Sequence, residues 1–231
     1  RLSQTVALPG QRMQPAGAGN PYVVGFPSLA GDGSAFGTNM TGYVMLKHVQ
    51  IDYTGDYISE YKGSTPAIQF RYADVLLNYA EALAEKNGAA NAGKIIEILH
   101  PLRERAGMPD IDFDREYNTS AEYPFRNLDK YIQAVRRERR VEKALEGRRV
   151  FDIMRWAAAE ELIIGNRAHG ALFIGSNLPE QYGPELKYDQ ASGNNMFLTG
   201  SPDDAERYIL PVPPSTMPNG WQFKPNRDYL L

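Results

Sequence analysis

Three glutamates stand four residues apart in the stretch ERRVEKALEGRRVFD, which covers positions 138–152. On an α-helix Glu138, Glu142 and Glu146 would share one face, with neighbouring Cβ atoms about 5–6 Å apart. A retaining glycosidase needs two carboxyl groups about 5–5.5 Å apart, one as acid and one as nucleophile. The spacing alone therefore permits paired-carboxylate catalysis on a glycosidic bond.

Arginines surround these glutamates and oppose an acid–base role. A general acid needs a carboxyl pKa that is raised by burial or by a neighbouring negative charge. Guanidinium groups do the reverse, because they stabilise the carboxylate and lower its pKa. The arginines concerned are Arg136, Arg137, Arg139, Arg140, Arg148 and Arg149. We therefore predict a half-buried, structural ion-pair network in place of a catalytic site. Its predicted members are Glu138, Glu142, Arg139 and Arg148.

A second acidic pattern, PDIDFDRE, is similar to the start of an EF-hand calcium loop. Its acidic side chains alternate along the chain and are Asp110, Asp112, Asp114 and Glu116. The sixth loop position, which requires glycine, is Arg115, and the twelfth is Ala121 in place of a bidentate glutamate. Calcium therefore stays a minor alternative. We expect no cofactor and no metal site, and we expect these acids to be solvated in a loop between helices.

Few other residues suggest chemistry. The sequence has no cysteine, which excludes disulfides, thiolate metal sites and cysteine nucleophiles. The segment GDGSAFG lacks the lysine and hydroxyl residue that complete a phosphate-binding loop. The three histidines are far apart in sequence and are His48, His100 and His169. We therefore expect a protein that is not an enzyme.

The bulk composition is that of a globular chain with no basic excess. Its 231 residues are 42% hydrophobic and 23% charged, which is enough for one large domain or two small ones. The formal net charge of −3 argues against nucleic acid as a partner, because phosphate binding needs a net basic face. No apolar run approaches the roughly 20 residues of a membrane span. Because the chain opens at Arg1, we expect a fragment or a processed form.

Helical periodicity is strongest between residues 67 and 107. One apolar stripe recurs at three- and four-residue steps and predicts a first helix that ends at Gly88. Its members are Ile68, Tyr72, Val75, Leu76, Tyr79 and Leu83. We expect Tyr79 and Leu83 to point into a helix–helix core. Small residues that would let a neighbouring helix approach closely are Ala73, Ala80 and Ala84.

A second helix is predicted over about 91–106, ending at Gly107 and kinked by Pro101. Two antiparallel helices joined by a short loop, about 35–40 residues in all, form a hairpin of tetratricopeptide size. Hairpins of this kind bury their apolar faces only against neighbours. Partner helices must therefore come from elsewhere in this chain or from a part of the protein outside it.

Two further helices are predicted over about 128–146 and 148–162. The flanking segments are rich in Gly, Pro, Asn and Tyr and indicate long loops with a few short strands, one of them at 208–210. We therefore expect one mainly α-helical domain over residues 1–231. Its parts are a loop-rich segment at 1–66, a helical core at 67–162, and loops with an extended C-terminal tail at 163–231.

Aromatic residues on these loops suggest a ligand site. Flat rings can stack on the C–H face of a sugar, while amide and carboxylate groups bind its hydroxyls. The candidate ligand-binding residues are Tyr22, Phe36, Tyr182 and Tyr188, with Asn20 and Asp32. Loops on a rigid scaffold are where binding residues concentrate. The same rings could instead pack against their own loops, and the sequence leaves both alternatives open.

Four segments resemble, in this order, the C-terminal region of the SusD/RagB family: FRYADVLLNYAEALAEKNG, LRERAGMP, ERRVEKALEGRRVFDIMRW, and YILPVPPSTMPN with KPNRDYL. The opening RLSQTVALPG and the later TGYVMLK are also similar to that region. The arginine–glutamate block followed by EGRRVFD and RW is specific in combination. Two features depart from the family pattern, namely Pro101 inside a helix and PNRDY in place of a QNPGY ending.

The resemblance implies a mainly α-helical protein with tetratricopeptide-like helix pairs, long irregular loops and a few short strands. Such proteins are lipid-anchored on the outside of the Gram-negative outer membrane and bind glycans or other nutrients without cleaving them. They cover a TonB-dependent, SusC-like transporter. The implied partners are this transporter, an oligosaccharide or other nutrient, and an N-terminal half of the same protein that carries the lipid anchor and is absent from this chain.

Two other functions stay open at this point. A tetratricopeptide-type scaffold would bind protein and no small ligand, and the helix pair favours it. A glycoside hydrolase would need two carboxyl groups in different environments facing a cleft, and the arginines disfavour it. Glycan affinity without turnover would distinguish nutrient binding from both.

Overall fold

The computed structural model describes residues 2–13, 23–25, 27, 39–49, 68–182, 197–212 and 215–224. The chain divides into two compact units, each assembled from separate stretches. The first unit contains Arg1–Thr5, Lys47–Gln50 and Gly55–Leu162, and the second contains Val6–Leu46, Ile51–Thr54 and Ile163–Leu231. The predicted helical core therefore lies in the first unit, and most of the two loop-rich segments belongs to the second.

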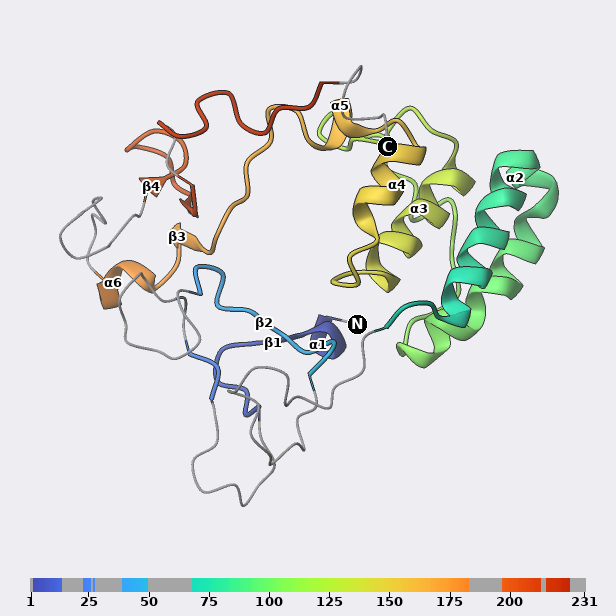
Figure 1. Ribbon diagram of the computed structural model, residues 1–231, viewed down its shortest axis with the longest axis horizontal. Helices are drawn as coiled ribbons and strands as arrows, with labels where there is room; N and C mark the ends of the chain where they lie inside the picture. The colour runs from blue at the N-terminus through green and yellow to red at the C-terminus, as the bar shows by residue number, and fades with distance from the viewer. Residues whose placement is uncertain are drawn as a thin grey trace. The chain divides into compact units, whose positions relative to one another are not determined.

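Helices build the first unit (Figure 1). They are α1 (Leu2–Thr5), α2 (Tyr72–Arg105), α3 (Lys130–Glu142), α4 (Arg149–Arg155) and α5 (Ala159–Leu162). The long α2 begins after Arg71, which has extended backbone angles. The amide of Arg71 donates to Oδ2 of Asp74 at 2.9 Å, so a carboxylate in the first turn satisfies the amide at the helix start. The helix therefore begins at Tyr72, within the region of helical periodicity that starts near residue 67.

The element α2 is a pair of helices separated by Asn87, whose backbone angles of φ −173° and ψ 90° are not helical. Figure 1 shows the two helices side by side and running in opposite directions. The side chain of Asn87 accepts a hydrogen bond from the amide of Ala90 at 3.0 Å and so caps the second helix. Pro101 lies within that second helix, and the helical hairpin predicted from the sequence is confirmed.

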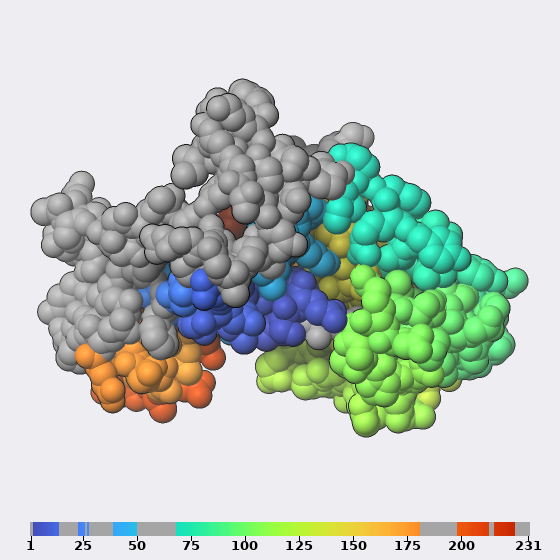
Figure 2. Space-filling model, turned by 90° about the horizontal axis from the view of Figure 1, so that it is seen from below, coloured from blue at the N-terminus to red at the C-terminus, as the bar shows by residue number. Residues whose placement is uncertain are grey.

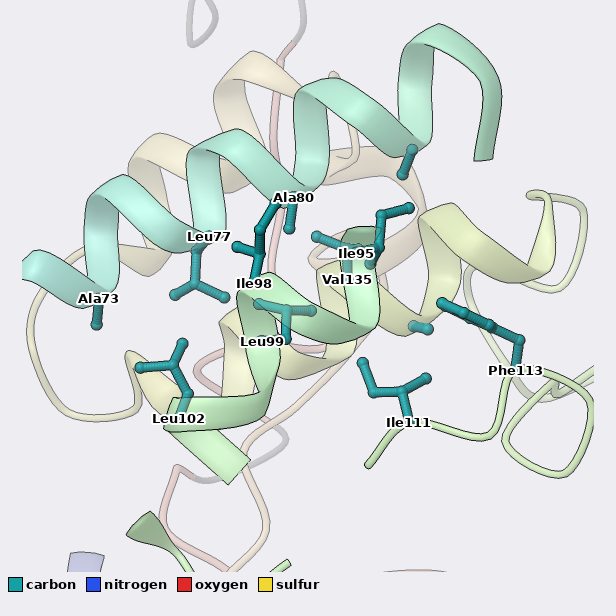
Figure 3. Packing of buried hydrophobic residues seen from close by; sticks show 12 residues of the cluster. Ala73, Leu77, Ala80, Ile95, Ile98, Leu99, Leu102, Ile111, Phe113 and Val135 are labelled. Carbon is teal, nitrogen blue, oxygen red and sulfur yellow. The ribbon is translucent and has the colours of Figure 1, made fainter. Parts of the chain in front are cut away.

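The hydrophobic core of the first unit lies between the two helices of α2, helix α3 and the loop that joins them (Figure 3). The first helix of α2 contributes Ala73, Leu77, Ala80 and Ala84, and the second contributes Ile95, Ile98, Leu99 and Leu102. Helix α3 adds Ala134 and Val135, and the loop adds Ile111 and Phe113. The three alanines are buried as predicted, because their small side chains let neighbouring helices approach. Burial of this apolar surface is the main driving force for packing the unit.

The predicted apolar stripe on the first helix of α2 is in part on the wrong side. Leu83 is half-buried and packs against the core, as predicted. Tyr79 is 49% exposed, and Tyr72 and Val75 are also exposed. The face that contacts α3 is instead centred on Leu77 and the alanines, about a third of a turn away. The larger side chains Tyr72, Val75 and Tyr79 instead lie on a second, exposed apolar face of the hairpin.

Helices α3 to α5 are shorter than predicted. The side chain of Asp129 accepts a hydrogen bond from the amide of Tyr131 at 2.8 Å and caps the start of α3. The chain leaves the helix after Glu142, and Leu145 has a positive φ of 64°. The region predicted as one helix over 148–162 is two, because Ala157 takes a φ of 47° between α4 and α5. A positive φ cannot continue a right-handed helix.

The second unit contains short strands and one short helix, α6 (Leu178–Tyr182). Strands β1 (Val6–Ala7) and β2 (Val44–Met45) pair antiparallel. Strands β3 (Leu172–Ile174), β5 (Arg207–Leu210) and β4 (Phe197–Leu198) form an antiparallel sheet in that spatial order. A small core of Phe173, Leu178 and Ile209 packs beside this sheet. The strand predicted at 208–210 is confirmed as β5.

Two glycines of α2 give a matched test of helix packing. A Cβ on Gly88 would lie 2.5 Å from Cβ of Tyr131 and 2.6 Å from its ring, whereas a Cβ on Gly93 would have no atom within 4 Å. We expect Gly88→Ala to lower the free energy of unfolding by about 1–3 kcal/mol through overpacking. Gly93→Ala should raise it by about 0.5–1 kcal/mol, because alanine favours a helix interior. Urea unfolding of both variants measures these changes, and a stable Gly88→Ala protein would contradict the close approach of Tyr131.

Candidate functional site

The residues predicted to bind a ligand lie almost wholly outside the described residues. Those outside are Asn20, Tyr22, Asp32, Phe36 and Tyr188. Tyr182 is the last residue of α6, and its side chain also lies outside what the structure describes. That site therefore stays a prediction, and the described residues offer a different cluster, the ion-pair network around α3.

Glu146 is the centre of this network. Arg71, which precedes α2, donates from Nη2 to Oε1 of Glu146 at 2.6 Å and from Nε to Oε2 at 3.2 Å. The same guanidinium reaches Oε1 of Glu142 at 2.8 Å through Nη1. Arg105 donates to that Oε1 at 2.6 Å from the other end of α2. One arginine therefore joins the start of α2 to two carboxylates at the end of α3, and its two bonds to Glu146 fix the geometry.

Two lysines complete the surroundings of Glu146. Lys143 Nζ lies 2.6 Å from Oε2 of Glu146 and 2.8 Å from Oδ2 of Asp74, and its side chain is only 3% exposed. Lys47 Nζ lies 2.9 Å from Oε1 of Glu146. Lys47 also donates to the backbone carbonyls of Glu142 and Ala144, at 2.8 and 3.0 Å. It therefore satisfies carbonyl groups that the end of a helix leaves without partners.

A second group of charges joins α2, α3 and the acidic loop. Arg103 donates to Oε2 of Glu138 and to Oε1 of Glu116, both at 2.9 Å, and to the carbonyl of Pro109 at 2.6 Å. Arg137 pairs with the other oxygen of Glu116. Glu116, which the calcium-like pattern includes, is therefore held between two arginines.

The other acids of PDIDFDRE are engaged separately. Asp110 pairs with Nδ1 of His100 at 2.7 Å, and Asp114 pairs with Lys130 at 2.5 Å. Asp112 accepts hydrogen bonds from the amides of Asp114 and Arg115, so it shapes its own turn. Within the described part of the chain, no group of three or more His, Cys, Asp or Glu residues could hold a metal ion.

A third group surrounds Trp156 at the end of α4. Both oxygens of Glu81 accept from Arg155 at 2.6 Å, and Oε1 also accepts from Nε1 of Trp156 at 2.6 Å. Asp152 accepts from Arg139 at 2.6 Å and from Arg155 at 3.0 Å. This group links the middle of α2 to α3 and α4.

Guanidinium groups also pack on the ring of Trp156. Those of Arg136, Arg155 and Arg149 lie 4.5, 4.9 and 5.3 Å from its centroid. Such cation–π contacts stabilise a cation that has little water around it. Burial, with the positive charge of Arg140 added to it, lowers the pKa of Arg149. Arg148 turns elsewhere and donates to the backbone carbonyl of Gln69.

The electrostatics of these carboxylates oppose acid catalysis. Burial alone raises a carboxyl pKa, but hydrogen bonds from Arg71, Lys143 and Lys47 outweigh it and lower the pKa of Glu146 to about 2. The same balance, with hydrogen bonds from Arg155 and Trp156, lowers the pKa of Glu81. A general acid near neutral pH needs the opposite shift. The network can therefore fix helices in place and is poorly suited to donate protons.

The sequence analysis does not predict several members of the network. They are Lys47, Arg71, Asp74, Glu81, Arg103, Lys143 and Asp152. The sequence does give a signal for two of these residues. Asp74 and Glu81 are seven residues, or two helical turns, apart, so they lie on one side of α2, next to its buried apolar residues. Charged residues on the apolar side of a helix are expected to be paired. Their partners come from distant parts of the chain, which spacing cannot reveal.

Comparison with known proteins places the chain in a family. The SusD family matches the chain over residues 1–231, and the chain belongs to this family. The SusD-like protein P25 of Formosa agariphila is 32% identical over 110 residues, which are 47% of this chain and 18% of that protein. A crystal structure of a SusD-like protein from Bacteroides fragilis superposes with a TM-score of 0.58 at 20% identity. It matches 98% of this chain and 34% of its own.

These matches confirm two expectations from the sequence. The resemblance to the SusD/RagB family is correct, and so is the mainly α-helical, tetratricopeptide-like fold with few short strands. The chain spans about a fifth of the curated relative and about a third of the solved structure.

Removing Glu146 tests the energetic importance of the network. Glu146→Ala leaves Lys143, which is almost fully buried, and Arg71 without a shared anion, and we expect it to cost about 3–5 kcal/mol of unfolding free energy. The matched control is Glu97→Ala, because Glu97 is exposed and pairs with exposed Lys94 at 2.7 Å. That pair should be worth less than about 1 kcal/mol. Chemical denaturation measures both variants, and equal effects would show that the network does not stabilise the unit.

The lowered pKa of Glu146 predicts a pH dependence of stability. A carboxyl whose pKa falls from 4.5 in the unfolded chain to about 2 in the folded one stabilises the fold fully above pH 4.5. That contribution is lost as the pH falls from 4.5 towards 2. Glu146→Gln cannot ionise, so its unfolding free energy should change less over this range than that of the parent protein. Parallel slopes for the two proteins in denaturant titrations at several pH values would contradict the pKa shift.

Proposed function

We propose that the chain belongs to a non-catalytic, nutrient-binding component of an outer-membrane uptake complex, with an oligosaccharide as its ligand. The observation that carries this proposal is the match to the SusD family over all 231 residues. Members of this family are in general non-catalytic binding proteins associated with the outer membrane. The names of the relatives support the family and leave the ligand of this chain open.

The charged network supports a binding role over hydrolysis. Glu138 and Glu142, whose spacing permits glycosidase chemistry, accept hydrogen bonds from Arg103, Arg71 and Arg105. Glu146 has a lowered pKa, Glu138 pairs with Arg103, and Glu142 pairs with Arg71 and Arg105. A retaining mechanism needs one carboxyl that stays protonated and one that is free to attack. Each of the three glutamates is instead paired with at least one cation.

In this proposal the partner is a TonB-dependent, SusC-like transporter, and the protein faces outward from the outer membrane on a lipid anchor. The anchor and the remaining tetratricopeptide-like helices belong to an N-terminal half. In the described part of the chain, no helix has both the length and the apolar character needed to cross a membrane.

The proposed ligand site uses the loop aromatics. Tyr22 and Phe36 would stack on sugar rings, and Asn20 and Asp32 would bind the hydroxyls at their rims. Tyr182, the last residue of α6, and Tyr188 form the second group. An open platform of this kind leaves much of the ligand in water, so affinities of about 4–8 kcal/mol, millimolar to micromolar, are expected.

One observation favours a second candidate function, a tetratricopeptide-type scaffold that binds protein. The exposed side chains of Tyr72, Val75 and Tyr79 form an apolar surface on α2. Contiguous exposed apolar surface marks sites of protein interaction. Glycan binding distinguishes the two candidates, because a scaffold has no need of it.

Calorimetric titration of the full-length protein with an oligosaccharide panel tests the proposal. We expect one class of oligosaccharide to bind without being cleaved, and the Tyr22→Ala/Phe36→Ala variant to lose at least about tenfold in affinity, or 1.4 kcal/mol. The control is Tyr117→Ala, since Tyr117 is an exposed aromatic of the first unit outside the proposed site. Unchanged affinity in a folded double variant would show that the ligand binds at a different site. No binding across the panel would favour the scaffold.

A further inference from the structure

Three arginines of α3 and α4 carry more positive charge than the acids beside them balance. Arg136 and Arg140 stand four residues apart on α3, so they lie on one face of that helix. Arg149 is the first residue of α4, and its guanidinium carbon lies 5.3 Å from the centroid of the Trp156 ring. We call Arg136, Arg140 and Arg149 the cationic cluster.

The acids near the cationic cluster do not neutralise it. Asp152 is close enough to act on Arg149, but it already accepts hydrogen bonds from two arginines outside the cluster. Glu85 is exposed and reaches a single nitrogen of Arg136, at 3.3 Å. Within the described part of the chain, Arg140 and Arg149 form no ion pair and donate no side-chain hydrogen bond. The cluster therefore has an excess of positive charge.

Two donors of the cluster are buried without an acceptor. Nη1 of Arg149 and Nε of Arg136 have no hydrogen-bond partner among the described residues. Burial, and after it the positive charge of Arg140, lower the pKa of Arg149. A buried donor of a charged group costs free energy when it has no acceptor. An anion bound to these arginines would offset that cost.

Aromatic rings hold the cluster in place. The guanidinium of Arg136 lies 4.5 Å from the centroid of Trp156 and 5.4 Å from that of Phe125, and the two rings meet edge to face at 5.9 Å. Phe125 belongs to the loop between α2 and α3, which the space-filling view shows in light green at the molecular surface (Figure 2). Arg140 is exposed. The donors are therefore positioned near the surface before a ligand arrives, which lowers the cost of binding it.

From this arrangement we propose that the cationic cluster is a binding site for an oxyanion, a sulfate or carboxylate group, between α3 and the start of α4. Guanidinium groups present paired N–H donors whose geometry matches the oxygens of such anions. The exposed Arg140 would meet the anion first, and the half-buried Arg149 would bind it where less water competes.

The oxyanion has two possible sources, a free ion or an acidic sugar of an oligosaccharide. The second source rests on the proposed function, whereas the site itself rests on the geometry of the cluster. Guanidinium groups already pack on the ring of Trp156, so this site would recognise charge and not the flat face of a sugar. It therefore differs in chemistry from the loop aromatics, and it would select uronate or sulfate groups within a longer ligand.

Arginine modification of the full-length protein tests the site. Phenylglyoxal reacts with accessible guanidinium groups, and mass spectrometry of peptides measures each arginine separately. The probe is sodium sulfate, compared with sodium chloride at equal ionic strength so that screening is the same. We expect saturating sulfate to slow the modification of Arg140 and Arg149 about fivefold or more, because only the free site reacts. Arg115, an exposed arginine of the same unit, is the internal control and should react equally in both salts.

Matched oligosaccharides separate the two sources of the anion. Calorimetric titration compares a uronic acid oligosaccharide with its neutral methyl ester, and a sulfated oligosaccharide with its desulfated form. We expect the acidic member of one pair to bind about tenfold more tightly, and Arg140→Gln and Arg149→Gln each to remove that preference. Arg115→Gln removes the same charge outside the cluster and should keep it. Because Arg140 is exposed, Arg140→Gln keeps the test valid if Arg149→Gln fails to fold.

Each outcome supports or overturns the proposal. Sulfate protection without a preference for acidic sugars would support the site and assign it to a free anion. Equal modification of Arg140 and Arg149 in both salts would overturn it. So would arginines that are unreactive without sulfate, because another part of the protein would then cover them. Neutral oligosaccharides that still bind in such a case would leave the proposed function intact, so the two proposals can fail separately.

Discussion

Glu146 is the acceptor on which the arrangement of the first unit depends. Three cations reach it from three stretches of chain, namely Lys47, Arg71 and Lys143. Because Arg71 stands at the start of α2 and Lys143 follows the end of α3, their shared carboxylate fixes how the two elements meet. A buried carboxylate without these partners would carry a large desolvation cost, so moving either helix out of the network would be unfavourable.

The apolar core and the charged network contribute differently to the packing of α2 against its neighbours. The alanine face of α2 supplies close contact with α3, and burial of its apolar surface provides the driving force. Apolar contact is not directional, whereas the bonds of Arg155 to Glu81 and of Arg103 to Glu138 are. The charged bonds therefore add directional contacts to a core whose apolar contacts alone do not fix the orientation of the helices.

The sequence predicts the kind of elements well and their partners poorly. The hairpin was visible from its periodicity and length, and the family from motifs that include EGRRVFD. The three- and four-residue spacing wrongly predicts Tyr79 in the core. Such spacing shows that apolar residues share one side of a helix, but it does not show which of two apolar sides is covered by a neighbouring helix. The residues that bind Glu138 and Glu142 include Arg71 and Arg103, which are distant in sequence, so no local pattern joins them. The ligand site depends on loop geometry, for which periodicity carries no information.

The double attachment at Glu146 has a consequence for how the chain can vary. Lys47 and Arg71 both bind Oε1 of Glu146, at 2.9 and 2.6 Å, so the two ends of the stretch between them are pinned at one point. Side chains that share one salt-bridge network are energetically coupled. A substitution at position 47, 71 or 146 therefore weakens the pairing of the other two, so a change at one of them is tolerated best when the others change with it.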